Sequence, residues 1–251
     1  NAILCFQILR QLALKHAGWI ALAFALHPVQ VESVAWVTEL KNVLSATMYG
    51  LAWLALYPLL LRLGSSAEPS GNPPGSSTER TARASWLPIS LGISCFIGAL
   101  LSKSVTASLP AAMLVAVWFQ TGTVKRRQLL AATPLLLLGA LFGWNTARLE
   151  VEFVGAQGSD FEHGWLARLG IAARCIVHYT TNAVAPLEQV FFYPRYVPSD
   201  WQAAAIAVGL VATGLAAAIV LAVRRSRRGP LAGLLFFAGS AFPALGFLNV
   251  Y

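Results

Sequence analysis

Five long stretches of the chain contain no charged residue, and they constrain the fold more than any other feature. They cover residues 43–61, 105–119, 129–144, 203–223 and 231–248. Apolar runs of about 17–25 residues match the hydrocarbon thickness of a bilayer. Because backbone amides find no water there, helices are the expected spanning form, and uninterrupted runs argue against a barrel of alternating strands. Charged residues make up only 11% of the chain, against about 25% in soluble domains.

The runs predict an all-α polytopic transmembrane helix bundle of about eight spans, forming a single transmembrane domain over residues 1–251. The first residue is not Met and the chain stops beside an apolar run, so we interpret the sequence as a fragment. The spans are expected at about residues 2–14, 17–36, 42–62, 87–102, 104–121, 128–147, 201–223 and 231–249. Pro28 is expected to end or kink the second of these, because proline lacks an amide donor.

Basic residues give the expected orientation. The net charge is +8, but the cations cluster between apolar runs, so they indicate membrane orientation rather than a nucleic-acid partner. Arg62, Lys125–Arg127 and Arg224–Arg228 are predicted to be cytoplasmic by the positive-inside rule. The Ser/Pro/Gly-rich segment 64–85 is then a flexible cytoplasmic linker, and 148–200 is extracytoplasmic.

The stretch 165–185 has two interpretations. Basic clusters on the same side require an even number of spans between them, and 128–147 and 201–223 already supply two. On a helical wheel its polar residues share one face and its apolar residues the other, which favours an outer interfacial or re-entrant helix. The alternative is a true span whose polar face lines the bundle. The polar face holds Arg174, His178, Thr181 and Asn182, and the apolar face holds Leu166, Leu169, Ala173, Ile176 and Val184.

Ionisable residues gather where spans meet the outer side. His27, Glu32, Glu39 and Lys41 lie within one short segment. Charges at that depth are costly, so they are usually paired or functional. The two interpretations are an ion pair that locks helices together, Glu39 with Lys41 or Glu32 with Lys103, and a binding site.

Two further segments are candidates on the same side. Lys103, between two apolar runs, can hold a phosphate as a point charge or extend toward lipid headgroups. The aromatic segment 186–196, with Tyr193 and Arg195, is either an interface belt or the wall of an outward-facing site for an acyl-linked substrate. The four histidines show no ligand spacing, so we predict no metal.

Together these segments resemble the membrane domain of the transmembrane-and-tetratricopeptide-repeat proteins, which are GT-C-type O-mannosyltransferases with bacterial relatives. The resemblance is carried, in order along the chain, by His27, Pro28, Glu32, Ser33, Val34, Ala35 and Trp36, by Lys103, Val105, Thr106, Leu109 and Pro110, and by Pro186, Leu187, Tyr193 and Pro194. The chain departs from the family at Gln30, where many relatives have His. It departs again at Glu39-Leu40-Lys41-Asn42, where bacterial relatives have Glu-Arg-Lys-Asp.

The resemblance implies a GT-C-like fold and transfer of a sugar from a polyprenyl-phosphate donor to a hydroxyl acceptor, a protein Ser or Thr, without a cofactor. The family's catalytic acidic pair is expected before Asn1. Substrate-binding residues are then His27, Glu32, Glu39, Lys41, Lys103, Arg174, His178, Tyr193 and Arg195, with Lys103 and Arg174 contacting phosphate. The expected location is a bacterial inner membrane, with the site facing the periplasm.

Two other functions compete with the transferase. A non-catalytic membrane anchor for a tetratricopeptide-repeat region is favoured by the loss of Arg and Asp at Leu40 and Asn42. A transporter or lipid-handling protein would predict inverted repeats or helices broken near the bilayer midplane, and the sequence has no convincing internal repeat.

Overall fold

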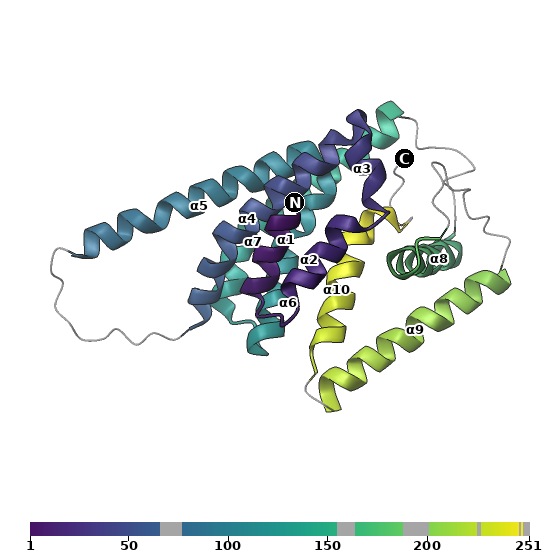
Figure 1. The fold of residues 1–251 in the computed structure, drawn as a ribbon. Helices are drawn as coiled ribbons and strands as arrows, with labels where there is room; N and C mark the ends of the chain where they lie inside the picture. Colours follow the sequence, from purple (N-terminus) through teal and green to yellow (C-terminus); the bar gives the residue numbers. More distant parts are fainter. Residues whose placement is uncertain (66–76, 155–163, 188–200, 225–226, 246, 248–251) are drawn as a thin grey trace. The chain divides into compact units, whose positions relative to one another are not determined.

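A computed structural model describes residues 1–65, 77–154, 164–187, 201–224, 227–245 and 247. The regular elements in these ranges are all helical (Figure 1), which confirms the predicted all-α class. The chain forms two compact units, Asn1–Ala140 and Leu141–Tyr251, where the sequence predicted one transmembrane domain.

The first unit is built around a long helix pair. Its elements are α1 (Ala2–Gln11), α2 (Ala17–Leu26), α3 (Gln30–Ala35), η1 (Val37–Glu39), α4 (Leu40–Gly64), α5 (Ser77–Ser102), η2 (Ser104–Ser108), α6 (Leu109–Thr121) and the first part of α7 (Arg126–Leu149). Helices α4 and α5 pack along each other, and α1 and α6 also contact α4. The pair is antiparallel, so the start of α4 and the end of α5 lie at the same end (Figure 1).

Large apolar side chains and a few paired polar groups form the core of this unit. The most buried apolar residues include Trp53, Tyr57, Phe96, Leu109, Met113 and Val117. The Tyr57 hydroxyl donates to Gln120 Oε1 at 2.7 Å, and Gln120 Nε2 donates to the Gln11 carbonyl at 2.7 Å. These two bonds join α4, α6 and α1, and they satisfy polar groups that are costly to bury unpaired.

The second unit contains the rest of α7, a π-helical turn η3 (Glu150–Val154), α8 (Trp165–Val184), α9 (Trp201–Arg224), α10 (Gly229–Ala241) and η4 (Phe242–Ala244). Helix α9 packs against both α8 and α10. A Cβ added at Gly170 would lie 2.8 Å from the Cβ of Ala204. Glycine at this position therefore lets α8 and α9 approach closely, as small residues do between membrane helices.

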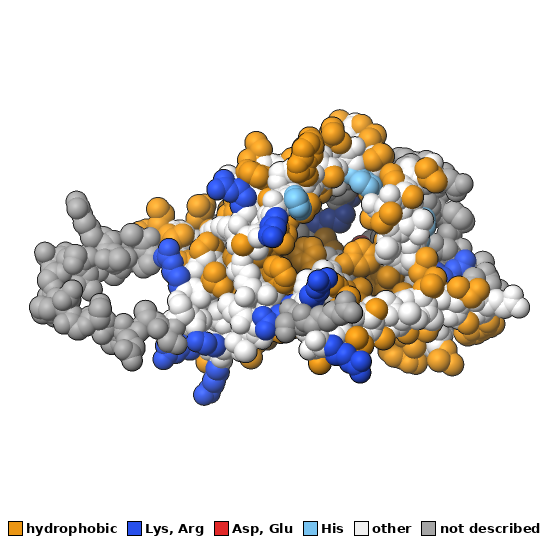
Figure 2. All heavy atoms as spheres, turned by 60° about the horizontal axis from the view of Figure 1, so that its bottom comes forward, with side chains coloured by type: hydrophobic (Ala, Val, Ile, Leu, Met, Phe, Trp, Pro, Cys, Tyr) orange, Lys and Arg blue, Asp and Glu red, His pale blue; other side chains and the backbone are white. Residues whose placement is uncertain are grey.

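Among the described residues, four helices are long and apolar enough to cross a membrane. They are Val37–Gly64, Ser104–Thr121, Arg126–Phe153 and Ala204–Arg224, and shorter apolar helices cover Ala2–Gln11, Ala17–Leu26, Trp86–Ser102 and Gly229–Ala244. Hydrophobic side chains are exposed over much of the surface in Figure 2. Hydrocarbon rather than water is the solvent that such a surface fits.

The predicted break at Pro28 is confirmed, because α2 ends at Leu26 and α3 begins at Gln30. One predicted boundary differs from the structure. The predicted linker 64–85 is helical from Ser77 onward, as the first part of α5, and its residues 66–76 lie outside the described part. The helix predicted at 165–185, within the segment 148–200, is present as α8.

Candidate functional site

The His27 segment forms the turn between α2 and α3. His27 itself has extended backbone angles, φ −68° and ψ 128°, which is the conformation that a residue before proline prefers. The backbone N–H of Val29 donates to His27 Nδ1 at 3.3 Å. The imidazole is therefore held against its own turn, and helix α3 then carries Glu32 and Ser33 toward the start of α4.

Lys103 occupies the sharp break between α5 and η2. Its backbone is extended, with φ −159° and ψ 120°, so it is the single residue between two helical segments. Because α4 and α5 are antiparallel, this break lies beside the first turn of α4. The Lys103 Nζ donates to Asn42 Oδ1 at 2.6 Å, across 61 residues of sequence.

Asn42 connects Lys103 to the other polar residues at this end of the unit. Its Nδ2 donates to Glu39 Oε2 and lies 3.5 Å from Ser33 Oγ. Glu39 Oε1 also pairs with Lys41 Nζ at 3.5 Å. Ser33, Glu39, Lys41, Asn42 and Lys103 therefore form one connected group, called the Lys103 cluster below.

Burial and nearby charges act on Lys103 in opposite directions. Partial burial lowers the pKa of Lys103 below its ordinary value of 10.5, because desolvation disfavours the charged ammonium. The carboxylates of Glu39 and Glu32 raise the same pKa, while the Lys41 ammonium lowers it. Glu32 thus acts on Lys103 electrostatically, although it is not part of the hydrogen-bonded cluster.

The cluster can bind an anion. An ammonium carries three N–H donors, and the Lys103–Asn42 bond uses one of them. Lys41 is exposed and adds a second cation next to Glu39. The described residues contain no group of three His, Cys, Asp or Glu side chains that could hold a metal ion.

The structure brings together only some of the predicted site residues. Glu39, Lys41 and Lys103 meet in the Lys103 cluster, with Glu32 in electrostatic range, and His27 lies one short helix away in the chain. Glu39 and Lys41 form the ion pair that one of the two interpretations of this segment contained.

The other predicted residues are not part of the first unit as the structure describes it. Arg174 and His178 belong to α8 in the second unit. His178 Nε2 lies 2.9 Å from Asn182 Nδ2, so these two residues of the predicted polar face are neighbours. Tyr193 and Arg195 fall outside the described residues.

Two cluster members, Ser33 and Asn42, were not selected for the site in the sequence analysis, and Asn42 is the one that contacts Lys103. It was noted only as a departure from an Asp in the resembling family. The sequence signal for including Asn42 in the site was its position in the first turn of α4, close after Glu39 and Lys41. The contact with Lys103 depends on how α4 and α5 pack, which the sequence pattern alone does not give.

Comparisons with protein-family models, curated proteins and solved structures find no match for this chain.

Proposed function

We propose that the chain is the membrane module of a GT-C-type glycosyltransferase, which transfers a sugar from a polyprenyl phosphate to a hydroxyl acceptor, a protein Ser or Thr. The supporting observation is the Lys103 cluster. It joins two cations and a carboxylate, and it lies where α4 begins and α5 ends in the first unit. Costly ionisable groups gathered beside apolar helices are typical of substrate sites in membrane proteins.

In this proposal, the cluster acts on the leaving group. As the bond between the sugar and the phosphate breaks, negative charge grows on the phosphate oxygens. The Lys103 ammonium stabilises that charge, and Asn42 holds the ammonium in place. Glu39 fixes Asn42 and Lys41, so the cations are positioned before the substrate arrives. His27 and Glu32 shape the sugar or acceptor pocket.

The proposed location is a bacterial inner membrane with the cluster facing the periplasm, where a lipid-linked donor and an acceptor protein can meet. The partners are membrane lipid, the polyprenyl-phosphate donor and the acceptor protein. In the proposed reaction the acceptor hydroxyl attacks the anomeric carbon, a carboxylate takes the hydroxyl proton, and the polyprenyl phosphate leaves as the sugar–phosphate bond breaks. The reaction as proposed uses no cofactor.

A second candidate function is a membrane anchor without catalysis. The observation that favours it is the internal pairing of the cluster, because Asn42 bonds to both Glu39 and Lys103, and Glu39 pairs with Lys41. Such a group can lock α4 to α5 without any ligand. The two proposals differ in whether Lys103 exchanges its Asn42 contact for a phosphate.

The test is sugar transfer from a radiolabelled polyprenyl-phosphate sugar to a Ser/Thr peptide, measured with the protein in vesicles. Lys103→Ala removes a charged hydrogen bond, typically about 1.5–3 kcal/mol, so transfer should fall by about 10- to 150-fold. Glu32→Gln should also strongly reduce transfer. The matched control is Lys15→Ala, which removes an exposed lysine of the same unit outside the cluster.

All variants should keep the membrane expression and thermal unfolding of the parent protein. Transfer at the parental rate by both Lys103→Ala and Glu32→Gln removes these residues from the mechanism. The assay uses the full-length protein, and no transfer by the full-length parent supports the anchor instead.

A further inference from the structure

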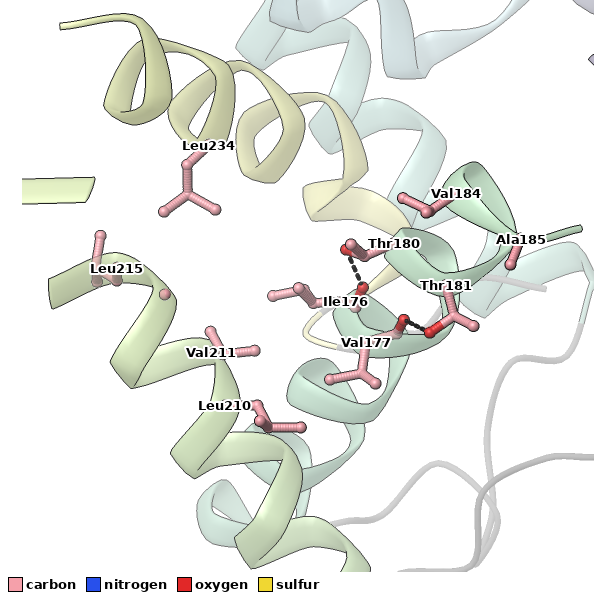
Figure 3. Close-up of a pocket in the computed structure, with 11 residues that line it drawn as sticks. Ile176, Val177, Thr180, Thr181, Val184, Ala185, Leu210, Val211, Leu215 and Leu234 are labelled. Atoms are coloured by element: carbon pink, nitrogen blue, oxygen red, sulfur yellow. Dashed lines mark hydrogen bonds between the residues drawn. The ribbon is translucent and has the colours of Figure 1, made fainter. Parts of the chain in front are cut away.

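The second unit contains a cavity of about 520 Å³ between three of its helices. Helix α8 contributes Ile176, Val177, Thr180, Thr181 and Val184, α9 contributes Leu210, Val211, Gly214 and Leu215, and α10 contributes Leu234, with Ala185 directly after α8 (Figure 3). The volume lies in the range of about 300–1,000 Å³ that is usual for small-molecule sites. The cavity is partly open, so a long molecule can enter it without filling a closed void.

The lining offers aliphatic carbon and no unsatisfied hydroxyl. Thr180 Oγ1 donates to the Ile176 carbonyl at 2.7 Å, and Thr181 Oγ1 donates to the Val177 carbonyl at 2.9 Å. Both bonds are drawn in Figure 3. A water molecule needs two to four polar partners to be stable in a cavity. The expected occupant is therefore a hydrocarbon rather than water or a polar ligand.

Helix α9 places this cavity at the level of a bilayer. Its span Ala204–Arg224 is the most apolar of the four candidate spans, and only 11% of it is buried within the protein. The wall formed by Leu210, Val211 and Leu215 belongs to this span. In a membrane, lipid chains are the surrounding solvent of α9, and they are present at far higher concentration than any soluble ligand.

The turn between α9 and α10 carries positive charge. Arg224 ends α9, and Arg227 and Arg228 lie just before α10. Leu215 is nine residues before Arg224, which is about 13 Å along a helix, and Leu234 is six residues after Arg228, about 9 Å. An anionic headgroup at these arginines therefore lies within one acyl chain's length of the cavity. Basic groups next to membrane helices favour anionic lipids.

We propose that an anionic membrane phospholipid binds the second unit, with one acyl chain in the cavity and its phosphate at Arg224, Arg227 and Arg228. The cavity selects the hydrocarbon chain, and the arginines select the charge. The residues of this site belong to the second unit and those of the Lys103 cluster to the first, and the proposal does not depend on sugar transfer.

Two glycines of α9 provide a matched test. A Cβ at Gly214 or at Gly209 meets no atom within 4 Å, so both accept a larger side chain, but only Gly214 lines the cavity. The probe is phosphatidylglycerol with a photoreactive diazirine on its acyl chain, in phosphatidylcholine nanodiscs, with labelled peptides mapped by mass spectrometry. Gly214→Phe should reduce labelling of the lining peptides about fivefold or more, because the ring occupies the space of the chain. Gly209→Phe should label like the parent protein.

The role of the lipid headgroup charge is first tested with the unsubstituted protein. Labelling by diazirine phosphatidylglycerol should exceed labelling by diazirine phosphatidylcholine, and high salt should reduce the difference. Replacing the three arginines by glutamine should remove the preference for phosphatidylglycerol. Each arginine is expected to contribute roughly two- to fivefold to the ratio of labelling by the two lipids. Equal labelling by the two lipids, unchanged labelling of Gly214→Phe, or no labelling of the lining peptides overturns the proposal.

Discussion

Replacing Gln128 by methionine tests how the first unit joins the end of α4 to the start of α7. Gln128 is 1% exposed. Its Nε2 donates to the Leu60 carbonyl at 3.1 Å, and its Oε1 accepts the backbone N–H of Lys125 at 2.9 Å. Gly64 leaves room for this amide, since a Cβ there would collide with it.

Methionine has nearly the same length and volume as glutamine, so the substitution removes hydrogen bonds and leaves little cavity. Two buried hydrogen bonds at about 1 kcal/mol each predict a loss of about 2 kcal/mol in the free energy of unfolding. For a chain of this size, that corresponds to a decrease in Tm of about 4–8 °C.

The assay is thermal unfolding in detergent, followed by circular dichroism. The control is Gln7→Met on the exposed side of α1, which should change the free energy by less than about 0.5 kcal/mol. A Gln128→Met protein that is as stable as the parent would mean that the amide does not hold α4 to α7, and the described contact would be wrong.

Three further predictions concern the helix contacts and the Lys103 cluster. Gly170→Val should destabilise the α8–α9 contact by about 1–3 kcal/mol, because its Cβ would meet Ala204 at 2.8 Å, and chemical unfolding measures this. Phosphate binding should weaken as pH rises, starting below pH 10.5, because the pKa of Lys103 is lowered and only the ammonium form binds phosphate. The Glu39 carboxylate raises this pKa, so in Glu39→Gln the binding should weaken at a still lower pH. A titration series of phosphate binding against pH measures both effects. Asn42→Ala should weaken polyprenyl-phosphate binding less than Lys103→Ala does, because it removes the positioning bond and keeps the charge.

The helical class and most helix positions followed from the sequence, because a long apolar run has few alternatives in a bilayer. The break at Pro28 also followed, since a missing amide donor is a local property. The helical start of α5 did not, because the Ser- and Pro-rich composition of residues 64–85 as a whole is typical of linkers, while the residues from Ser77 continue directly into an apolar helix.

Contacts between distant residues were predicted less well. The pair of Glu39 and Lys41 is two residues apart and was expected, whereas Asn42 meets Lys103 only because α4 and α5 pack as an antiparallel pair. The faces of α8 are also less separated than the wheel predicted, since Thr181 and Ile176 both line the cavity.

The most direct test of the transferase proposal is the equilibrium binding of a polyprenyl phosphate to the parent protein and to Lys103→Ala, at neutral pH and with Lys15→Ala as the control. The proposal predicts saturable binding by the parent and by Lys15→Ala, with a dissociation constant at least about tenfold higher for Lys103→Ala. Equal dissociation constants for all three proteins would contradict it, because the Lys103 ammonium would then make no contact with the phosphate.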